Sequence, residues 1–328
     1  MARSLTVYHL SFTTETVTPL ETDEHCGAAL RGNVYESVWR RFCTNKASPS
    51  CAACELHTAC PVSALVAPLR EENTWGRDVP RPYLMMPPLE GARRYETGER
   101  FRFGMTLFGS IIRLLPYIMI AVPGIEAAGV GKRIQELEGR RGRFEVCTVE
   151  SHHLFTGERQ LLYERGTVVA VQPALAITAE DVRARAEQFH PERLTVHFLT
   201  PTRIVDKEHL VRRPTFRPLV QRLLERLIAL EEAYGEGVES SYARMSSEER
   251  RQLLARAEEV ICCEDATYWD DLKSYSRRLG RKTPLGGFVG RVTFTGELIP
   301  FRELLAWGEL IHVGKSCVKG NGWYRIEG

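Results

Sequence analysis

The spacing of apolar and polar residues in the first half of the chain predicts a succession of strands and helices. Residues 5–14 alternate between apolar and polar side chains and end in threonines, which indicates a strand. In residues 27–42, Leu30, Val34 and Val38 recur at every fourth position, which places them on one face of a helix. The further predicted elements are a strand over 100–108, an apolar helix over 110–122 with a kink at Pro116, a strand over 143–149 and a hairpin over 154–172.

The second half shows a similar mixture of elements. Four leucines share one face of a helix predicted over 216–234. Ser246 and Glu249 form a capping signal at the start of a helix predicted over 246–260. The charged segment 178–193 is predicted to link the two halves. The remaining predictions are strands over 194–204, 268–275, 288–295 and 323–326, and a short helix over 301–310.

Both halves follow the same order of elements: a strand, a helix, a further strand, an apolar helix, a short turn and a last strand. The turn has the sequence x-Val-Gly-Lys in both halves, at 129–132 and at 312–315. This is the order of two βαββαβ units, the ferredoxin-like motif whose sheet is the platform of many RNA-binding modules. We therefore predict an α+β chain of tandem ferredoxin-like (RRM-like) domains at 1–175 and 190–328. The first carries a small metal-binding insertion at 43–68, and the second carries a glycine-rich loop.

Composition and charge narrow the partners of such a chain. It has 328 residues, enough for two domains, and a net charge of only +2. A nearly neutral chain that binds nucleic acid must concentrate its positive charge locally. The longest apolar stretch, 111–122, is shorter than the roughly 18 residues that span a bilayer, and it contains Arg113. The first residues include no apolar signal-peptide core, so we expect a cytoplasmic protein with no membrane partner.

Nine cysteines, four of them clustered, point to a metal site. An odd number in a chain of this size argues against a secreted disulfide framework. Cys43, Cys51, Cys54 and Cys60 supply the four thiolates that a structural zinc ion needs, so we predict zinc here and no catalytic metal. An iron–sulfur cluster is the main alternative, because Cys60 precedes a proline as in ferredoxins. Four cysteines that bind no metal are the other alternative. His57, inside the same segment, either replaces one cysteine as a ligand or is a surface residue.

A glycine-rich segment near the C-terminus is the second chemical signal. Gly314, Gly320 and Gly322 are close enough together for backbone N–H groups to approach an anion, and Lys315 and Lys319 add positive charge. The spacing is not that of a phosphate-binding P-loop. We predict that these five residues bind phosphates of a nucleic acid. The alternative is a flexible turn between a helix and a strand.

A run of basic residues is the third signal. Arg277, Arg278, Arg281 and Lys282 are followed by Arg291, and no acidic residue lies between 277 and 291. Such a run suits contacts with phosphates, so we predict that the first four residues bind RNA. Charge runs often form only a solvated surface, which is the competing interpretation.

Histidines are the candidate acid/base groups, because imidazole exchanges a proton near neutral pH. His25 stands in the loop just before the first helix, where the chain emerges at one edge of the predicted sheet. His312 ends a helix beside the glycine-rich loop. We predict His25 as a general acid or base, Tyr35 as an assisting group and His312 as the next candidate. The alternatives are a plain loop residue for His25 and helix-end packing for His312.

Several short stretches, spread over nearly the whole chain, carry a family resemblance. The stretches are Gly27-Ala-Ala-Leu-Arg-Gly32, Cys54 to Pro61, Phe103-Gly-Met-Thr-Leu-Phe-Gly109, Leu115-Pro-Tyr117, Gly129-Val-Gly-Lys132, Phe198-Leu-Thr-Pro201, Gly286-Gly-Phe-Val-Gly290, His312-Val-Gly-Lys315 and Gly320-Asn-Gly-Trp-Tyr324. In this order they resemble the RAMP-superfamily CRISPR precursor-RNA-processing endoribonucleases, in the branch with a cysteine-rich insertion in the first domain. That family's loop usually has an aromatic residue where Lys319 stands.

The resemblance implies an endoribonuclease that binds CRISPR repeat RNA in a cleft between two domains and cleaves the precursor transcript within its repeats. It also implies metal-independent general acid/base attack by the 2′-hydroxyl, which leaves a 2′,3′-cyclic phosphate and a 5′-hydroxyl. A non-catalytic RNA-binding subunit of a CRISPR effector complex, built on the same fold, is the first alternative. A zinc-bearing scaffold with no affinity for repeat RNA is the second.

Overall fold

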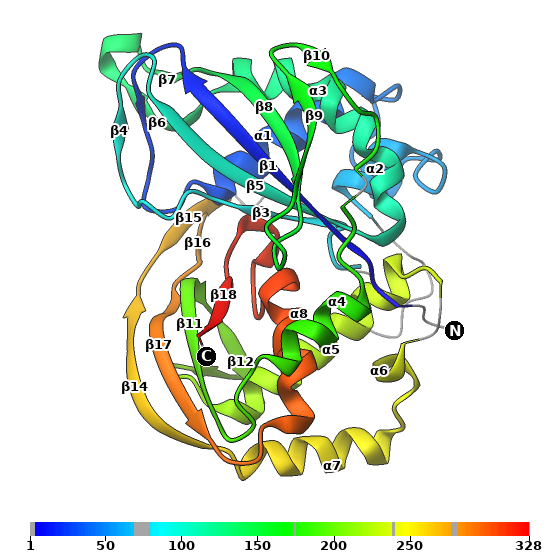
Figure 1. Ribbon diagram of the computed structural model, residues 1–328. Coiled ribbons are helices and arrows are strands. Elements are labelled where there is room, and N and C mark those ends of the chain that lie inside the picture. Colours follow the sequence, from blue (N-terminus) through cyan, green and yellow to red (C-terminus); the bar gives the residue numbers. More distant parts are fainter. Residues whose placement is uncertain (1–3, 69–78, 174, 238–239, 277–280, 328) are drawn as a thin grey trace. The chain divides into compact units, whose positions relative to one another are not determined.

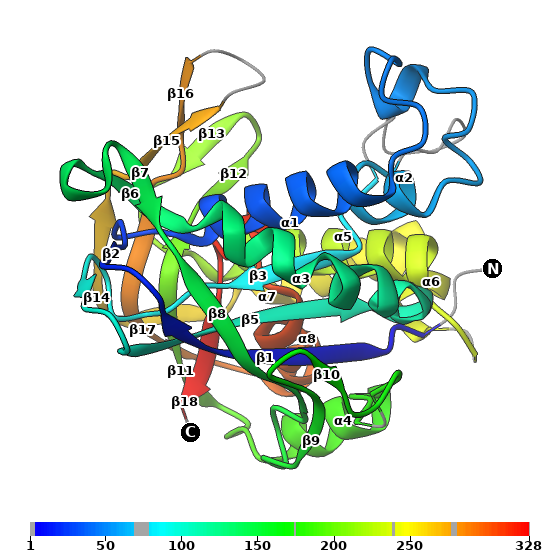
Figure 2. The same cartoon turned by 90° about the horizontal axis from the view of Figure 1, so that it is seen from above.

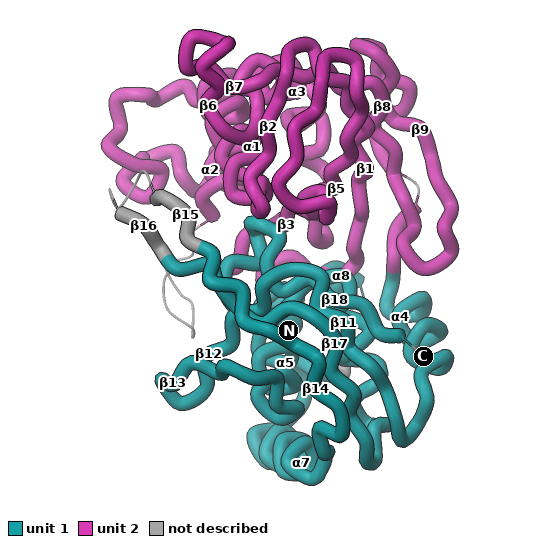
Figure 3. Tube along the Cα trace, turned by 90° about the vertical axis from the view of Figure 1, so that its left-hand side faces the viewer, with its two compact units in different colours: residues 1–5, 178–232, 236–328 teal, residues 6–177, 233–235 magenta. Residues whose placement is uncertain are grey.

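The computed structural model describes the chain except for residues 1–3, 69–78, 174, 238–239, 277–280 and 328. The chain folds into two compact units (Figure 3). The N-terminal unit comprises residues 6–177 and 233–235, and the C-terminal unit comprises residues 1–5, 178–232 and 236–328. The main boundary lies close to the predicted one. The segment predicted as a linker is instead a helix of the C-terminal unit, α4 (Ala179–Glu187).

The N-terminal unit is built on a six-stranded antiparallel sheet with the order β10-β9-β8-β1-β5-β3. The central strand β1 (Val7–Thr16) pairs with β5 (Arg100–Phe108) on one side and with β8 (Phe144–His152) on the other. β3 (Tyr83–Met86) forms the edge next to β5. Together with two helices, these four strands make a ferredoxin-like unit, in which the spatial order of the strands is 4-1-3-2.

Helices α1 (Gly27–Phe42) and α3 (Leu115–Ala128) cover one face of this sheet (Figures 1 and 2). α1 has the predicted bounds, and its predicted apolar face, which includes Leu30 and Val38, is buried. The other elements of the unit are α2 (Pro61–Val66), the strands β2 (Leu20–Glu21), β4 (Arg94–Tyr95), β6 (Val130–Ile134), β7 (Arg140–Gly142), β9 (Arg159–Glu164) and β10 (Thr167–Val168), and the 3₁₀ turns η1 (Cys51–Ala53), η2 (Gly109–Leu114) and η3 (Gln135–Leu137).

The apolar segment Gly109–Ala128 differs from its prediction. It begins with the 3₁₀ turn η2, so Pro116 lies in the first turn of α3, where its missing N–H leaves no helical hydrogen bond unmade. The proline inside the helix is Pro123. By length and composition alone this segment is able to cross a membrane. Within the unit, however, Ile118 and Val122 are fully buried, as expected of a helix that packs on a sheet.

The C-terminal unit has a four-stranded antiparallel sheet with the order β14-β17-β11-β18. Helix α5 (Phe216–Tyr234) lies between β11 and β14 in the sequence, and α8 (Arg302–Ile311) lies between β17 and β18. This is again the βαββαβ arrangement, so the prediction of tandem ferredoxin-like domains is confirmed. The strands are β11 (Arg193–Thr202), β14 (Ile261–Asp270), β17 (Gly287–Thr295) and β18 (Tyr324–Glu327).

The second strand of this unit is where the sequence prediction fails. β14 begins at Ile261 rather than at 268, and a separate hairpin of β15 (Lys273–Ser276) and β16 (Arg281–Pro284) follows it. None of the residues of β14 is buried, so no apolar–polar alternation marks it in the sequence. The other elements of the unit are α6 (Ser241–Arg244), α7 (Ser247–Glu258), β12 (Ile204–Asp206), β13 (His209–Val211), and the 3₁₀ turns η4 (Ile299–Phe301) and η5 (Cys317–Lys319).

Helix α8 is fixed in place by polar as well as apolar contacts. Tyr324 of β18 is fully buried, and its hydroxyl donates a hydrogen bond to the Leu305 carbonyl oxygen of α8 at 2.8 Å. Gly308 leaves room for this hydroxyl, because a Cβ at that position would lie 1.9 Å from it. Glu309 binds the Arg185 guanidinium of α4 through two hydrogen bonds of 3.0 and 3.1 Å. These contacts position the helix whose end leads into the glycine-rich loop.

Replacing Gly308 by alanine should lower the free energy of unfolding by about 1–3 kcal/mol, because the added methyl group collides with the Tyr324 hydroxyl. Denaturation in urea, followed by circular dichroism, measures the change. Gly32→Ala in α1 is the matched control, since a Cβ there meets no atom within 4 Å. The control should be neutral or stabilise by up to about 1 kcal/mol. An equal loss of stability in both variants would contradict this account of the packing.

Candidate functional site

His25 occupies the turn immediately before α1, in the N-terminal unit. Its ring is largely buried, and Nε2 has no hydrogen-bond partner among the described residues. Burial lowers the pKa of His25 from 6.5 to about 4, with the Glu24 carboxylate acting in the opposite direction. The imidazole is therefore neutral at pH 7, which is the form that acts as a general base and not as a general acid.

Tyr35 lies too far along α1 to assist His25 directly. At 1.5 Å of rise per residue, Tyr35 is about 12 Å along the helix axis from its first residue, Gly27. Burial, and then the nearby Cys51 thiol, raise the pKa of Tyr35, so the phenol stays protonated at neutral pH. Its side chain lines a pocket formed by the cysteines. The structure thus separates two residues that the sequence prediction placed in one site.

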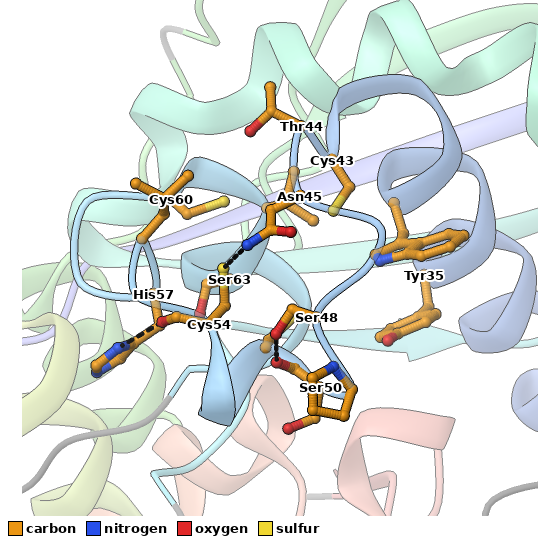
Figure 4. A pocket seen from close by; sticks show the side chains of 15 residues that line it. Tyr35, Cys43, Thr44, Asn45, Ser48, Ser50, Cys54, His57, Cys60 and Ser63 are labelled. Atoms are coloured by element: carbon orange, nitrogen blue, oxygen red, sulfur yellow. Dashed lines mark hydrogen bonds between the residues drawn. The ribbon is translucent and has the colours of Figure 1, made fainter.

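The four clustered cysteines line one pocket of about 140 Å³ at the adjoining ends of α1 and α2. Figure 4 shows the Cys43, Cys54 and Cys60 sulfurs facing this pocket, whereas the His57 imidazole points away from it. The Nδ1 atom of His57 lies 3.1 Å from the Cys54 carbonyl oxygen. Across the described part of the chain, no three or more His, Cys, Asp or Glu side chains are already arranged to hold a metal ion. The predicted ligands are therefore neighbours whose sulfurs have not converged.

The predicted glycine-rich loop of the C-terminal unit is held by its own backbone. Gly320 and Gly322 have φ angles of 90° and 73°, which favour glycine. Both are buried, and their N–H groups donate hydrogen bonds of 2.8 and 3.1 Å to carbonyl oxygens of the protein. These two glycines therefore shape the loop, and their N–H groups are not available to an anion as the sequence suggested. Gly314 is partly exposed, with a φ of 87°, and packs against the backbone of Arg203.

His312 ends α8 and has no exposed surface. Its ring is parallel to the Trp323 indole, with the centroids 5.9 Å apart, and its Nδ1 lies 3.2 Å from the Asn321 carbonyl oxygen. Its backbone, with φ 60° and ψ 172°, adopts a conformation that is essentially restricted to glycine. A fully buried ring cannot touch a phosphodiester in this conformation, which argues against the predicted acid/base role. His312 instead fixes the start of the loop.

The two lysines of the loop differ in exposure. Lys315 is exposed, whereas Lys319 is partly buried in the turn η5. The backbone N–H of Lys315 donates to the Arg203 carbonyl oxygen at 2.9 Å, which ties the loop to the residue just before β12. Of the predicted lysines, Lys315 is thus the better placed to meet a phosphate.

A cluster of two arginines and a tryptophan beside this loop has no counterpart in the sequence predictions. The guanidinium carbons of Arg212 and Arg203 lie 4.5 and 5.9 Å from the centroid of the Trp269 ring. Arg203 also donates to the Gly286 carbonyl oxygen at 3.2 Å. Within the described structure, neither arginine is paired with a carboxylate. The three residues come from different segments of the chain, so no local motif marks the cluster.

The predicted basic run lies only partly within the described structure. Arg277 and Arg278 are outside the described residues. Arg281 and Lys282 lie on β16, in the hairpin with β15. Arg291, which follows the run, donates two hydrogen bonds of 2.8 and 3.1 Å to the Glu327 carboxylate. Its charge is already neutralised, so Arg291 does not add to the run as a phosphate contact.

Comparison with family models gives a match in each unit. A family described as AF_1859_N, N-terminal domain, matches residues 5–175, slightly more than half of the chain. The family of the CRISPR-associated endoribonuclease Cas6 matches residues 196–324. The comparison with curated proteins gives no match.

Solved structures share the fold of the whole chain. A Cas6 product complex is 14% identical, with a TM-score of 0.56, and the match covers 98% of this chain and 99% of the other. Thermus thermophilus Cas6 is 13% identical, with a TM-score of 0.53, over the full length of both chains. A partial Cas6-RT-Cas1–Cas2 complex has a chain that is 13% identical, with a TM-score of 0.59, over 99% of this chain and 46% of that one. At such low identities, these matches establish the fold alone.

The backbone of His312 provides a test of its role. Substitution by glycine or by alanine removes the same ring, but only glycine adopts φ 60° and ψ 172° without strain. We expect His312→Gly to be more stable than His312→Ala by about 1–3 kcal/mol in urea denaturation. At most ordered positions alanine is the more stabilising of the two. A more stable alanine variant would show that this turn is not strained.

Proposed function

We propose that the chain is a Cas6-type CRISPR-associated endoribonuclease and that it cleaves CRISPR precursor RNA within the repeats. The observation that carries the proposal is the Cas6 family match over residues 196–324, next to a first unit that matches a family model over 5–175. The fold gives weaker support for this activity, because ferredoxin-like sheets occur both in enzymes and in non-catalytic RNA-binding modules.

The RNA-binding surface proposed for the C-terminal unit consists of Lys315, Arg203, Arg212 and Trp269. Lys315 and Arg212 are exposed cations, and none of the three cations has a carboxylate partner within the described structure. Such cations neutralise phosphates, and an indole flanked by guanidinium groups suits stacking with an unpaired base. This surface supplies the local positive charge that a chain of net charge +2 requires.

The proposed reaction is attack of a ribose 2′-oxygen on the adjacent phosphorus. The 2′-hydroxyl loses its proton, the bond from the 2′-oxygen to phosphorus forms, and the bond from phosphorus to the 5′-oxygen breaks. The 5′-oxygen takes up a proton and leaves as a hydroxyl, and the other product ends in a 2′,3′-cyclic phosphate. A neutral His25 suits the removal of the first proton. Lysine and arginine side chains stabilise the extra negative charge of the phosphorane.

A labelled repeat RNA should be cut in excess EDTA, provided that any structural metal stays bound. One 2′-deoxy nucleotide immediately 5′ of the cut should abolish cleavage, because it removes the nucleophile. Denaturing gel electrophoresis of the unmodified and the 2′-deoxy substrate measures how much of each is cleaved. Cleavage of the deoxy substrate, or an absolute need for a divalent ion, would refute the 2′-hydroxyl route. Tight binding of the unmodified RNA without cleavage would refute the proposed activity as a whole.

His25→Ala should slow single-turnover cleavage by about 10²-fold or more, the size expected for one acid/base group, and leave RNA affinity nearly unchanged. If His25 acts as a base, the wild-type rate should rise with pH until His25 is deprotonated in the complex and then level off. The variant should lose that rise. His190→Ala is the control, because His190 is an exposed histidine of the other unit. A His25→Ala variant that cuts at the wild-type rate would reduce His25 to a loop residue.

Lys315→Ala and Arg212→Ala should each weaken binding of repeat RNA and lower the slope of log affinity against log salt by about 1, because each lost phosphate contact releases less counterion. Trp269→Ala should weaken binding by about 1–3 kcal/mol with little change in slope. Arg281→Ala tests the predicted basic run in the same titration. Arg291→Ala is the control, because Glu327 already neutralises that arginine. Unchanged slopes in the first two variants would make these residues ordinary solvated surface.

A further inference from the structure

Residues 43–60, here called the cysteine segment, fold without a hydrophobic core of their own. None of these 18 residues is buried, and the only regular element is the 3₁₀ turn η1. Ordering such a segment costs conformational entropy that burial of apolar surface normally offsets. A segment of this kind therefore needs another source of stability, such as a bound metal or a covalent cross-link.

The less exposed residues of this segment are mostly of the types that can bind metals. Six of the 18 residues are only partly exposed, and four of them are the clustered cysteines; the other two are Ser48 and His57. Leu56, in contrast, is 49% exposed. The segment thus turns its sulfur atoms toward its interior and an apolar side chain toward solvent, which is the reverse of an ordinary loop.

Two of the four cysteines adjoin helix ends, and the other two lie at the start and just after the end of a tight turn. Cys43 directly follows α1, and its N–H donates to the Trp39 carbonyl oxygen at 2.9 Å. Cys60 directly precedes α2, whose residues Val62 and Leu65 are buried in the N-terminal unit. Cys51 begins η1 and Cys54 directly follows it, and residues three positions apart lie on the same side of a 3₁₀ turn.

A neighbouring side chain already donates to one of the sulfurs. Asn45 Nδ2 lies 3.6 Å from Cys54 Sγ, and this hydrogen bond is drawn in Figure 4. Side chains that hydrogen-bond to a ligating atom hold it in position at metal sites, and Asn45 is placed to do this for the Cys54 sulfur. All four cysteines are free thiols, so no disulfide closes the segment in this structure.

We propose that Cys43, Cys51, Cys54 and Cys60 bind one zinc ion, which holds the cysteine segment together and fastens the end of α1 to the start of α2. The four cysteines line a single pocket, but their sulfurs are not arranged around one point, so binding requires rotation of cysteine side chains. Four thiolates complete a tetrahedron and leave no position for a reactive water. The site is therefore structural, and it does not depend on the RNA chemistry proposed above.

Elemental analysis of the purified full-length chain should give about one zinc per molecule. The double variant Cys51→Ser/Cys54→Ser should lose that zinc. The matched control is Cys262→Ser/Cys263→Ser, which removes two exposed, adjacent cysteines on β14 and should retain it. Absence of metal, iron with acid-labile sulfide, disulfides found by mass spectrometry among the four cysteines, or equal zinc loss in both variants would each overturn the proposal.

A second measurement covers the case in which the double variant does not fold. Titration of the wild-type chain with a mercurial should release the zinc, and release should make residues 43–60 newly sensitive to a protease while β1 and β5 stay protected. Zinc release that leaves the protease sensitivity of the cysteine segment unchanged would place the metal elsewhere and refute the assignment. Neither readout uses RNA cleavage, so failure here and failure of the proposed activity are distinguishable.

Discussion

The backbone turn that ends the second helix of each βαββαβ motif determines where the next stretch of chain lies. In the N-terminal unit, α3 ends at Gly129 with φ 62° and ψ 173°, and in the C-terminal unit α8 ends at His312 with φ 60° and ψ 172°. The short x-Val-Gly-Lys repeat of the sequence is thus also a repeat of conformation. Glycine adopts this turn freely, whereas the histidine is strained, and its stacking on Trp323 offsets part of the strain.

The position of the proposed RNA-binding surface follows from this turn. Beyond His312 the loop is fixed by the buried Asn321, whose amide donates to the carbonyl oxygens of Pro201 and Leu285 at 3.3 and 3.1 Å. The Thr200 hydroxyl adds a bond of 2.8 Å to the Gly320 carbonyl oxygen. A loop held at this many points presents Lys315 to solvent in one place, and its glycines provide the backbone angles that this shape requires.

Sequence reasoning succeeded where one local pattern decides the structure. The bounds of α1, β5 and α5 agree with their predictions, because each has strong periodicity, and Ser246 and Glu249 form the expected capping box. It failed at β14, whose side chains are all at least partly exposed. It also missed candidate residues that only the tertiary fold brings together, and it grouped candidate residues that the fold separates. The Arg203, Arg212 and Trp269 cluster is an example of the first, and the separation of Tyr35 from His25 is an example of the second.

The central claim is that this chain is an endoribonuclease whose nucleophile belongs to the RNA itself. The chemical ends of the two products test this most directly. Mass spectrometry of a cleaved repeat RNA should find a 2′,3′-cyclic phosphate on the upstream fragment, and polynucleotide kinase should label the downstream fragment without prior phosphatase treatment, because that fragment begins with a 5′-hydroxyl. An upstream 3′-hydroxyl with a downstream 5′-phosphate, as left by attack of water at a two-metal site, would contradict the account.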